Sequence, residues 1–246
     1  MIPKIIHYCW FGRKPLPPLA IKCIESWKKY LPDYEIKEWN EDNFNVYSIP
    51  YTQEAYQAKK YAFVSDYARF WILYNYGGLY FDTDVELIKP INDIIEQGDF
   101  WGCEGSLYNI NTIAINPGVG IGCRVQHPFY KKILDYYATL HFFSSNNTTI
   151  VKYTTDIMKQ YGWEQQNTIQ KIYNMTIYPI DYFSPIDIIT KKIIKTNNTR
   201  SIHWYTGSWE DFNLFKFTKK KIKQITPIKL QITYNKLKNF LLYYKM

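Results

Sequence analysis

Two acidic residues stand at the end of an apolar run in the stretch "GGLYFDTDV", residues 77–85. In an extended strand, residues two apart project to the same side, so Asp82 and Asp84 would lie roughly 6 to 7 Å apart. Two carboxylates in an apolar strand repel each other and lose hydration unless a cation neutralises them. Mg²⁺ and Mn²⁺ take oxygen ligands and share them with substrate phosphates. The pair therefore predicts a divalent metal site, with a solvated surface turn as the alternative.

A second charged pair precedes the first on a predicted helix over residues 54–76. The sequence "SDYAR" places Asp66 and Arg69 three residues apart, on one helical face. An ordinary intrahelical ion pair would account for this spacing. In the alternative, functional interpretation, both side chains point into a cleft beside Asp82 and Asp84. There Arg69 would counter negative charge, and Asp66 would accept hydrogen bonds from sugar hydroxyls.

A third stretch, "SIHWYTGSW", covers residues 201–209 and contains one of only four histidines. His203 fits either a buried structural residue or a third metal ligand. Ser208 lies close to a glycine that permits tight backbone approach, which suits a phosphate donor.

These residues need a scaffold, and the order of elements predicts an α/β sheet. In such sheets, ligands bind at the carboxyl ends of the strands. Two glycines end the helix over residues 54–76, and the strand that follows carries the acidic pair to that edge. Strands are predicted at 3–11, 34–40, 79–88, 99–103, 112–116, 175–183 and 201–205, with helices at 19–32, 54–76 and 128–140.

Composition narrows the class of protein. The chain has 246 residues, 46% of them hydrophobic, which predicts a globular domain rather than a disordered chain. Its four cysteines are scattered, which argues against a zinc cluster or a disulfide framework. The first residues lack the features of a secretory leader, and no apolar run reaches the roughly 18 to 20 residues that span a bilayer. These features predict a cytoplasmic protein.

The positive charge is concentrated in a tail. Residues 216–246 hold nine of the 30 basic residues and no acidic ones, which leaves 21 basic against 22 acidic residues in 1–215. A neutral body argues against nucleic acid as a partner, since that would need a basic face built into the fold. The tail mixes lysines with aromatic and aliphatic residues, which indicates either a solvated end or a peripheral membrane anchor at the inner face of the plasma membrane.

Taken in order, "PKIIHYCWFG", "SDYARFWILYNYGGLYFDTDV", "HPF", "IYPIDYFSPI" and "IHWYTGSW" resemble glycosyltransferase family 32, which carries a D-x-D sugar-binding region. This family is related to the catalytic domains of clostridial glucosylating toxins. The resemblance covers residues 2–212 and implies a GT-A type nucleotide-diphosphosugar transferase fold, with a Rossmann-like mixed central sheet flanked by helices. It sets the catalytic domain at residues 1–215 and leaves 216–246 as the lysine-rich tail.

The resemblance also implies roles for individual residues. Asp82, Asp84 and Arg69 would be catalytic, and Asp82, Asp84 and His203 would bind Mn²⁺ or Mg²⁺. This chain has His203-Trp204 where relatives often carry two histidines. Asn116 and Asp156 are candidates for the acceptor side. The residues implied in donor binding are His7, Tyr8, Trp10 and Gly12 around the nucleotide, Asp66, Arg69 and Asp82 around the sugar, and Ser208 and Trp209 at the diphosphate.

The implied activity is a metal-dependent hexosyl transfer that retains anomeric configuration. The donor would be a nucleotide-sugar, with UDP-sugars expected. The acceptor would be a growing surface glycan or lipid-linked glycan, as in capsule, exopolysaccharide or lipopolysaccharide synthesis. Two alternatives use the same acidic pair: a metal-dependent phospho- or nucleotidyltransferase, which would want a phosphate-cradling glycine loop that this sequence lacks, and a non-catalytic nucleotide-sugar-binding module.

Overall fold

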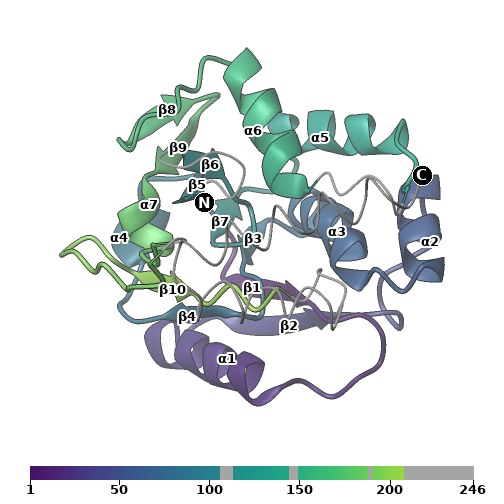
Figure 1. Cartoon of the computed structure of the whole chain (residues 1–246), viewed down its shortest axis with the longest axis horizontal. Coiled ribbons are helices and arrows are strands. Elements are labelled where there is room, and N and C mark those ends of the chain that lie inside the picture. Colours follow the sequence, from purple (N-terminus) through teal and green to yellow (C-terminus); the bar gives the residue numbers. More distant parts are fainter. Residues whose placement is uncertain (106–112, 144–148, 188–189, 208–246) are drawn as a thin grey trace, which may run out of the picture. The chain divides into compact units, whose positions relative to one another are not determined.

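The computed structural model describes residues 1–105, 113–143, 149–187 and 190–207. The residues Met1–Thr206 form one compact unit. Strands and helices alternate along it (Figure 1). The helices are α1 Pro18–Tyr30, α2 Pro50–Gln57, α3 Tyr61–Tyr76, α4 Asn92–Ile95, α5 Pro128–Ala138, α6 Ile150–Gln160 and α7 Ile180–Phe183. The strands are β1 Ile5–Cys9, β2 Glu35–Trp39, β3 Gly78–Tyr80, β4 Val85–Leu87, β5 Phe100–Gly105, β6 Ile113–Ile115, β7 Ile121–Cys123, β8 Gln170–Ile172, β9 Met175–Tyr178 and β10 Ser201–His203.

The central sheet is mixed, with the strand order β2-β1-β3-β7-β5-β9-β8 and β6 paired to β5. Strand β1 pairs in parallel with both β2 and β3, so three carboxyl ends meet at one edge. Strand β7 is antiparallel to β3 and β5, while β5 and β9 are parallel. A separate two-stranded sheet joins β4 to β10. The predicted α/β architecture is confirmed.

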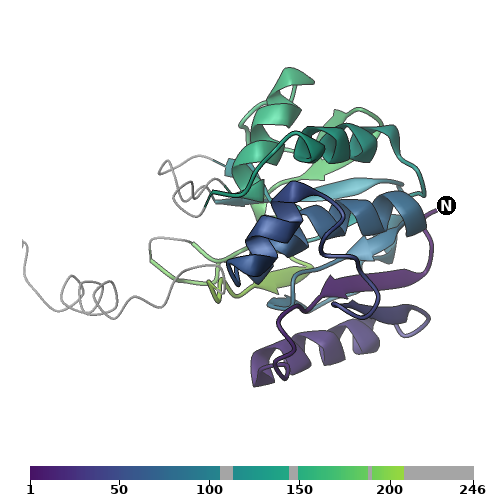
Figure 2. The same ribbon diagram turned by 90° about the vertical axis from the view of Figure 1, so that its right-hand side faces the viewer.

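Helices cover both faces of the sheet, so the residues of β1 are buried on either side. Helix α1 lies on one side of β1 and β2, and α3 and α5 lie on the other (Figures 1 and 2). Ile6 and Tyr8 pack in a core with Trp27 of α1. His7, which alternates with them, packs against Trp39 and Tyr76.

The predicted helix over 54–76 is two helices. Helix α2 ends before Ala58, and α3 begins at Tyr61. Lys59 between them has φ 58°, a left-handed conformation that a continuous helix does not accommodate. The predicted stop after α3 is confirmed, because Gly77 has φ 63° and its N–H bonds the carbonyl of Leu73 at 2.9 Å.

The predicted strand over 79–88 is also divided, and this changes the setting of the acidic pair. Strand β3 belongs to the central sheet and β4 to the small one. The three residues after Phe81 form the turn between them, closed by a hydrogen bond from Val85 N–H to the carbonyl of Asp82 at 3.0 Å. The prediction that the two aspartates share one strand face is therefore wrong. Each is held by a different sheet.

Other differences are local. The stretch 175–183 is strand β9 followed by helix α7, because Pro179 ends the strand and serves as the N-cap of the helix. Helices α4 and α6 and strands β7 and β8 were not predicted. The four cysteines are buried and unpaired, as expected from their spacing. No helix among the described residues is long and apolar enough to cross a bilayer.

Candidate functional site

The site lies where the carboxyl ends of the three parallel strands β2, β1 and β3 meet. Trp10 follows β1, Glu41 lies just beyond β2, and Asp82 lies just beyond β3. In an α/β sheet this edge is the usual place for a ligand, because the strands stop there and the loops leave a concavity.

Arg69 joins the two pairs that the sequence singled out. One nitrogen of its guanidinium, Nη2, lies 3.0 Å from Oδ1 of Asp66 and 3.2 Å from Oδ1 of Asp82. Its Nε donates to the carbonyl of Ser65 at 3.2 Å, and Tyr80 donates to Asp82 at 3.1 Å. The Arg69 side chain is only 4% exposed, so this is a buried ion cluster rather than a surface pair.

Burial and charge set the electrostatics of this cluster. Burial raises the pKa of Asp66 to about 7, against the opposing effect of Arg69. For Arg69 itself, burial alone would lower the pKa, but the carboxylates of Asp82 and Asp66 raise it overall, so the guanidinium stays charged. Nη1 of Arg69 is buried and has no hydrogen-bond partner among the described residues. An oxygen atom of a bound substrate could accept a hydrogen bond from Nη1.

Asp82 is held against a glycine turn. Its N–H donates to the carbonyl of Gly118 at 2.9 Å, and a Cβ added to Gly118 would lie 1.8 Å from Oδ2 of Asp82. The buried side chain of Asn116 accepts from the Gly118 N–H at 2.7 Å. Asn116, an acceptor-side candidate, is thus brought next to the acidic residue. The absence of a side chain at residue 118 leaves room for the Asp82 carboxylate.

Asp84 is placed by the small sheet. Strand β10 pairs with β4 so that His203 stands opposite Val85, and Nε2 of His203 lies 3.4 Å from Oδ1 of Asp84. Thr206 donates its N–H and its hydroxyl to Oδ2 of Asp84, each at 2.9 Å. Burial alone would raise the pKa of Asp84, but His203 and the two bonds from Thr206 hold it well below its usual range. This carboxylate stays ionised.

The geometry fits a divalent cation with few protein ligands. Two ligands of one Mg²⁺ or Mn²⁺ ion, each about 2.1 Å from it, lie about 3 Å apart, close to the separation of Asp84 Oδ1 and His203 Nε2. The described residues contain no cluster of three or more carboxylate, imidazole or thiolate ligands around one point. Such ions are commonly held by one or two side chains plus water and substrate phosphates, so two ligands suffice.

The side chains of His7 and Tyr8 are buried, and their predicted place around the nucleotide stays a prediction. The His7 side chain is fully buried: Trp39 donates to its Nδ1 at 3.0 Å, so Nε2 carries the proton and donates to the carbonyl of Gly77 at 3.0 Å. Tyr8 is buried and donates its hydroxyl to Glu38 at 2.7 Å. Both faces of β1 are covered, so in this structure these side chains pack against neighbouring residues rather than against solvent.

Trp10 lies at a surface depression, and Gly12 is hydrogen-bonded to Glu41, one of the residues that line it. Trp10, partly exposed, lines a shallow pocket of about 300 Å³, and its indole N–H donates to the carbonyl of Lys14 at 2.6 Å. Gly12 has φ 94°, its N–H donates to Glu41 at 2.6 Å, and a Cβ there would meet the ring of Tyr61. The pocket is lined by Trp10, Arg13, Lys14, Pro15, Glu38, Asn40 and Glu41.

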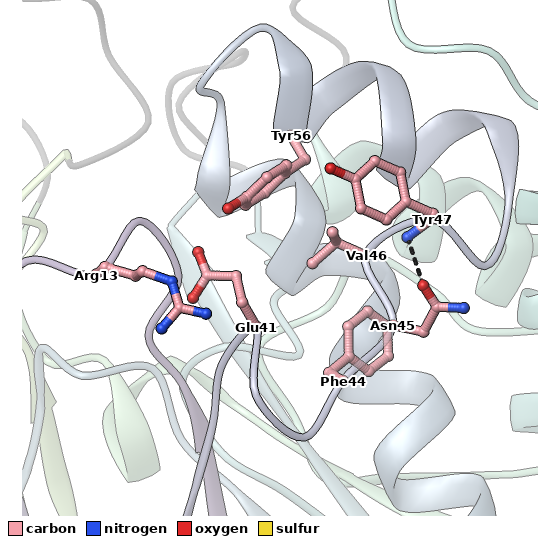
Figure 3. Close-up of a pocket in the computed structure, with 7 residues that line it drawn as sticks. All are labelled: Arg13, Glu41, Phe44, Asn45, Val46, Tyr47 and Tyr56. Carbon is pink, nitrogen blue, oxygen red and sulfur yellow. Dashed lines mark hydrogen bonds between the residues drawn. The ribbon is translucent and has the colours of Figure 1, made fainter.

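A second pocket of about 290 Å³ shares Arg13 and Glu41 with the first (Figure 3). Its walls come from the loop after β2 and from helix α2. Figure 3 shows the Glu41 carboxylate between the side chains of Arg13 and Tyr56. The lining residues are Arg13, Glu41, Phe44, Asn45, Val46, Tyr47 and Tyr56.

One predicted site residue is not brought to this edge, and two others lie outside the described residues. Asp156, on α6, is exposed and forms an ion pair with Lys152 one helical turn earlier. Ser208 and Trp209 lie outside the described residues, as does the predicted domain boundary at residue 215.

Known protein families include one that matches the part of the chain from α1 to β5. Residues 17–101 match the family described as a glycosyltransferase sugar-binding region containing a DXD motif. This stretch of the chain is similar to that family. The matched region contains Arg69, its two partners Asp66 and Asp82, and also Asp84. The resemblance to D-x-D glycosyltransferases is confirmed.

The chain is also similar to individual glycosyltransferases. It is 32% identical over 161 residues to an uncharacterized glycosyltransferase of Acanthamoeba polyphaga mimivirus. The aligned residues cover 63% of this chain and 61% of that protein. It is 25% identical over 168 residues to inositol phosphoceramide mannosyltransferase 1 of Schizosaccharomyces pombe, covering 63% of this chain and 47% of that protein. The chain thus spans about half to three fifths of the length of these relatives.

The fold has a counterpart among solved structures. The PaToxG glycosyltransferase superposes with a TM-score of 0.51 at 19% identity, over 65% of this chain and 69% of that one. The expected GT-A type fold, a mixed central sheet flanked by helices, is confirmed.

Residues that sequence reasoning missed complete the site around the DXD region. Thr206, which fixes Asp84, and Glu104, which faces His203, stand at positions with no recognisable spacing to the residues that they contact. Gly118 belongs to "NPGVGIG", in which three glycines and one proline are typical of a turn but do not show which residue lies against it. Only the strand pairing brings these residues to the site.

Proposed function

We propose that this chain transfers a hexose from a nucleotide-sugar to a glycan acceptor, with a UDP-sugar as donor, Mn²⁺ or Mg²⁺ as cofactor and retention of anomeric configuration. One observation carries the proposal: within a DXD glycosyltransferase region, Arg69 bridges Asp66 and Asp82, and Asp84 faces His203 across the small sheet. Positive and negative groups are thus set side by side at the carboxyl edge, as a sugar diphosphate requires.

Each group has a task that follows from its contacts. Asp84 and His203 would hold the cation, which neutralises the diphosphate and stabilises the charge that grows on the leaving phosphate. The charged guanidinium of Arg69 orients Asp66 and Asp82, whose remaining oxygens accept hydrogen bonds from hydroxyls of the sugar or the ribose. The exposed face of Trp10 suits the base by stacking. We infer a front-face route, in which the acceptor hydroxyl attacks on the side from which the phosphate departs.

The experiment is release of nucleoside diphosphate from UDP-glucose, with and without Mn²⁺, by isosteric variants. Asp84→Asn and Asp82→Asn should each lower kcat by about 100- to 1000-fold, because a charge that stabilises the transition state is lost. EDTA should abolish turnover of the wild type. Glu25→Gln removes an exposed carboxylate paired with Lys28 and serves as the matched control, with unchanged turnover expected. Full activity of either aspartate variant, or of the wild type in EDTA, would refute the site assignment.

A second candidate differs in donor and acceptor. The similarity to inositol phosphoceramide mannosyltransferase 1 of Schizosaccharomyces pombe suggests a mannose donor such as GDP-mannose, with the headgroup of an inositol phosphoceramide as acceptor. Thermal-shift measurements with UDP-glucose, UDP-galactose and GDP-mannose, each with and without Mn²⁺, distinguish the two. The true donor should raise the melting temperature only when the metal is present.

A further inference from the structure

Glu104 is a buried carboxylate that no step of the proposed chemistry uses. It lies on β5 opposite Ala114 of β6, and the residue is 3% exposed. Its Oε2 lies 3.4 Å from Nδ1 of His203, and neither of these two buried atoms has a hydrogen-bond partner among the described residues. The other ring nitrogen of His203 faces Asp84 at 3.4 Å. His203 is therefore placed between two carboxylates from different sheets.

A carboxylate at this place carries a cost that a purely structural residue would avoid. An unpaired charge in a protein interior costs several kcal/mol, whereas an apolar side chain would suit the buried strand around Glu104. The cost is offset only if a positively charged or hydrogen-donating group faces it. Among the described residues the imidazole of His203 is such a group, directly opposite.

The ring of His203 is also fixed from its face. The ring of Tyr205 packs on it with centroids 4.1 Å apart, and the Tyr205 hydroxyl is held by the hydroxyl of Ser184 at 2.8 Å. Tyr205 has φ 52°, an uncommon conformation for a residue other than glycine. Backbone strain of this kind persists where the surroundings over-determine it. The packing holds the plane of the imidazole, and Glu104 can set which nitrogen faces Asp84.

We propose that Glu104 is a positioning residue: it accepts the Nδ1–H of His203 and so presents the Nε2 lone pair toward Asp84 and the cation between them. This inference rests on the metal site of the proposed function. Carboxylates behind histidine ligands act in this way in metal sites, and their loss weakens metal affinity by about 10- to 100-fold.

The test measures Mn²⁺ binding directly, without sugar donor, from the free Mn²⁺ signal in electron paramagnetic resonance. Glu104→Ala should weaken Mn²⁺ affinity by about 10- to 100-fold. Glu104→Gln keeps an acceptor for Nδ1–H and should lose less, so affinity should fall in the order wild type, Gln, Ala. Asp99→Asn is the matched control, because Asp99 is equally buried just before the start of β5 and pairs with Arg124 instead. It should alter stability and leave Mn²⁺ affinity unchanged.

Coupling to His203 separates positioning from a general loss of structure. In a His203→Ala background, adding Glu104→Gln should change Mn²⁺ affinity by less than about 2-fold, since the group it positions is gone. An unchanged affinity in Glu104→Gln and Glu104→Ala, or an equal loss with and without His203, overturns the inference while the wild type still binds Mn²⁺. A wild type that binds no Mn²⁺ overturns the metal site of the proposed function and this inference together.

Discussion

Residue 118 decides how much room Asp82 has. The carboxylate of Asp82 occupies the space where a side chain at Gly118 would begin. Gly118→Ala should therefore displace a half-exposed carboxylate, lowering kcat at least about 10-fold while costing little stability, because the displaced group is the far end of a side chain. The readouts are nucleoside diphosphate release and the melting temperature.

The contrasting variant at this scale is Gly98→Ala. Gly98 has φ 104° and open space around it, so a side chain there strains the backbone without touching the site. It should lower stability by about 1 kcal/mol and leave kcat unchanged. If Gly118→Ala showed the same pattern, the close approach of Asp82 would have no part in activity.

Which site residues could be predicted depends on how local their contacts are. Asp66 and Arg69 lie one turn apart on α3, and two glycines carry the chain from that helix to Asp82, so their meeting was readable from spacing. Asp84 was placed on the same strand face as Asp82, although it turns away to meet His203, 119 positions later. His7 and Tyr8 were assigned to the nucleotide because they precede Trp10. Period-two alternation could not show that both faces of β1 are covered.

At the scale of elements, His7 ties β1 to β2 and to the turn before β3. Burial lowers the pKa of His7 to about 4 from its usual 6.5, so the imidazole is neutral in the folded protein. The unfolded chain takes up a proton below pH 6.5, and the folded one only below about 4. This contribution to the free energy of unfolding, about 3 kcal/mol, is present above pH 6.5 and lost as pH falls to 4.

Comparison with a variant isolates the contribution of His7. The pKa of Asp66, raised by burial to about 7, acts in the opposite direction, since folding favours its protonated form as pH falls from 7 toward 3.8. We therefore expect the difference in unfolding free energy between wild type and His7→Gln to shrink as pH falls from 6.5 to 4. Urea denaturation at several pH values measures it. A difference independent of pH would contradict the neutral, buried imidazole.

Helix α6 secures the strand that ends beside the site. The N–H of Ile115 in β6 donates to the hydroxyl of Thr155 at 3.0 Å, and the hydroxyl of Thr154 donates to the Ile115 carbonyl at 3.1 Å. Asn116 follows directly. Thr155→Val leaves a buried N–H without an acceptor and should lower the free energy of unfolding by about 1 to 3 kcal/mol. Thr154→Val should cost less, because carbonyls tolerate the loss of one partner better than N–H groups. Equal losses in denaturation would contradict this account.

For the whole molecule, the α/β class and the carboxyl edge followed from the alternation of strand and helix patterns, which are local. The strand order did not. Antiparallel β7 lies between β3 and β5, and β4 leaves the central sheet to pair with β10. The pairing of β4 with β10 joins residues more than a hundred positions apart, and all of these pairings depend on packing between elements rather than on the pattern within one. His203 and Glu104 gain their partners through these pairings.

The largest feature outside the described residues is the lysine-rich segment 216–246, and its effect is argued from charge alone. Nine lysines attract an anionic surface by about 1 kcal/mol each near the membrane, while the interspersed apolar residues favour the interface.

We expect the full-length protein to sediment with phosphatidylserine-containing vesicles and not with phosphatidylcholine vesicles. Replacing the nine lysines by glutamine in the full chain should abolish sedimentation, and high salt should weaken it by screening. Glutamine at the exposed Lys171, Lys192 and Lys195 of the body is the control and should leave binding intact. Equal, negligible sedimentation of wild type and variant would exclude an anchoring role, which a glycosyltransferase acting on a lipid-linked acceptor would otherwise use to stay near its substrate.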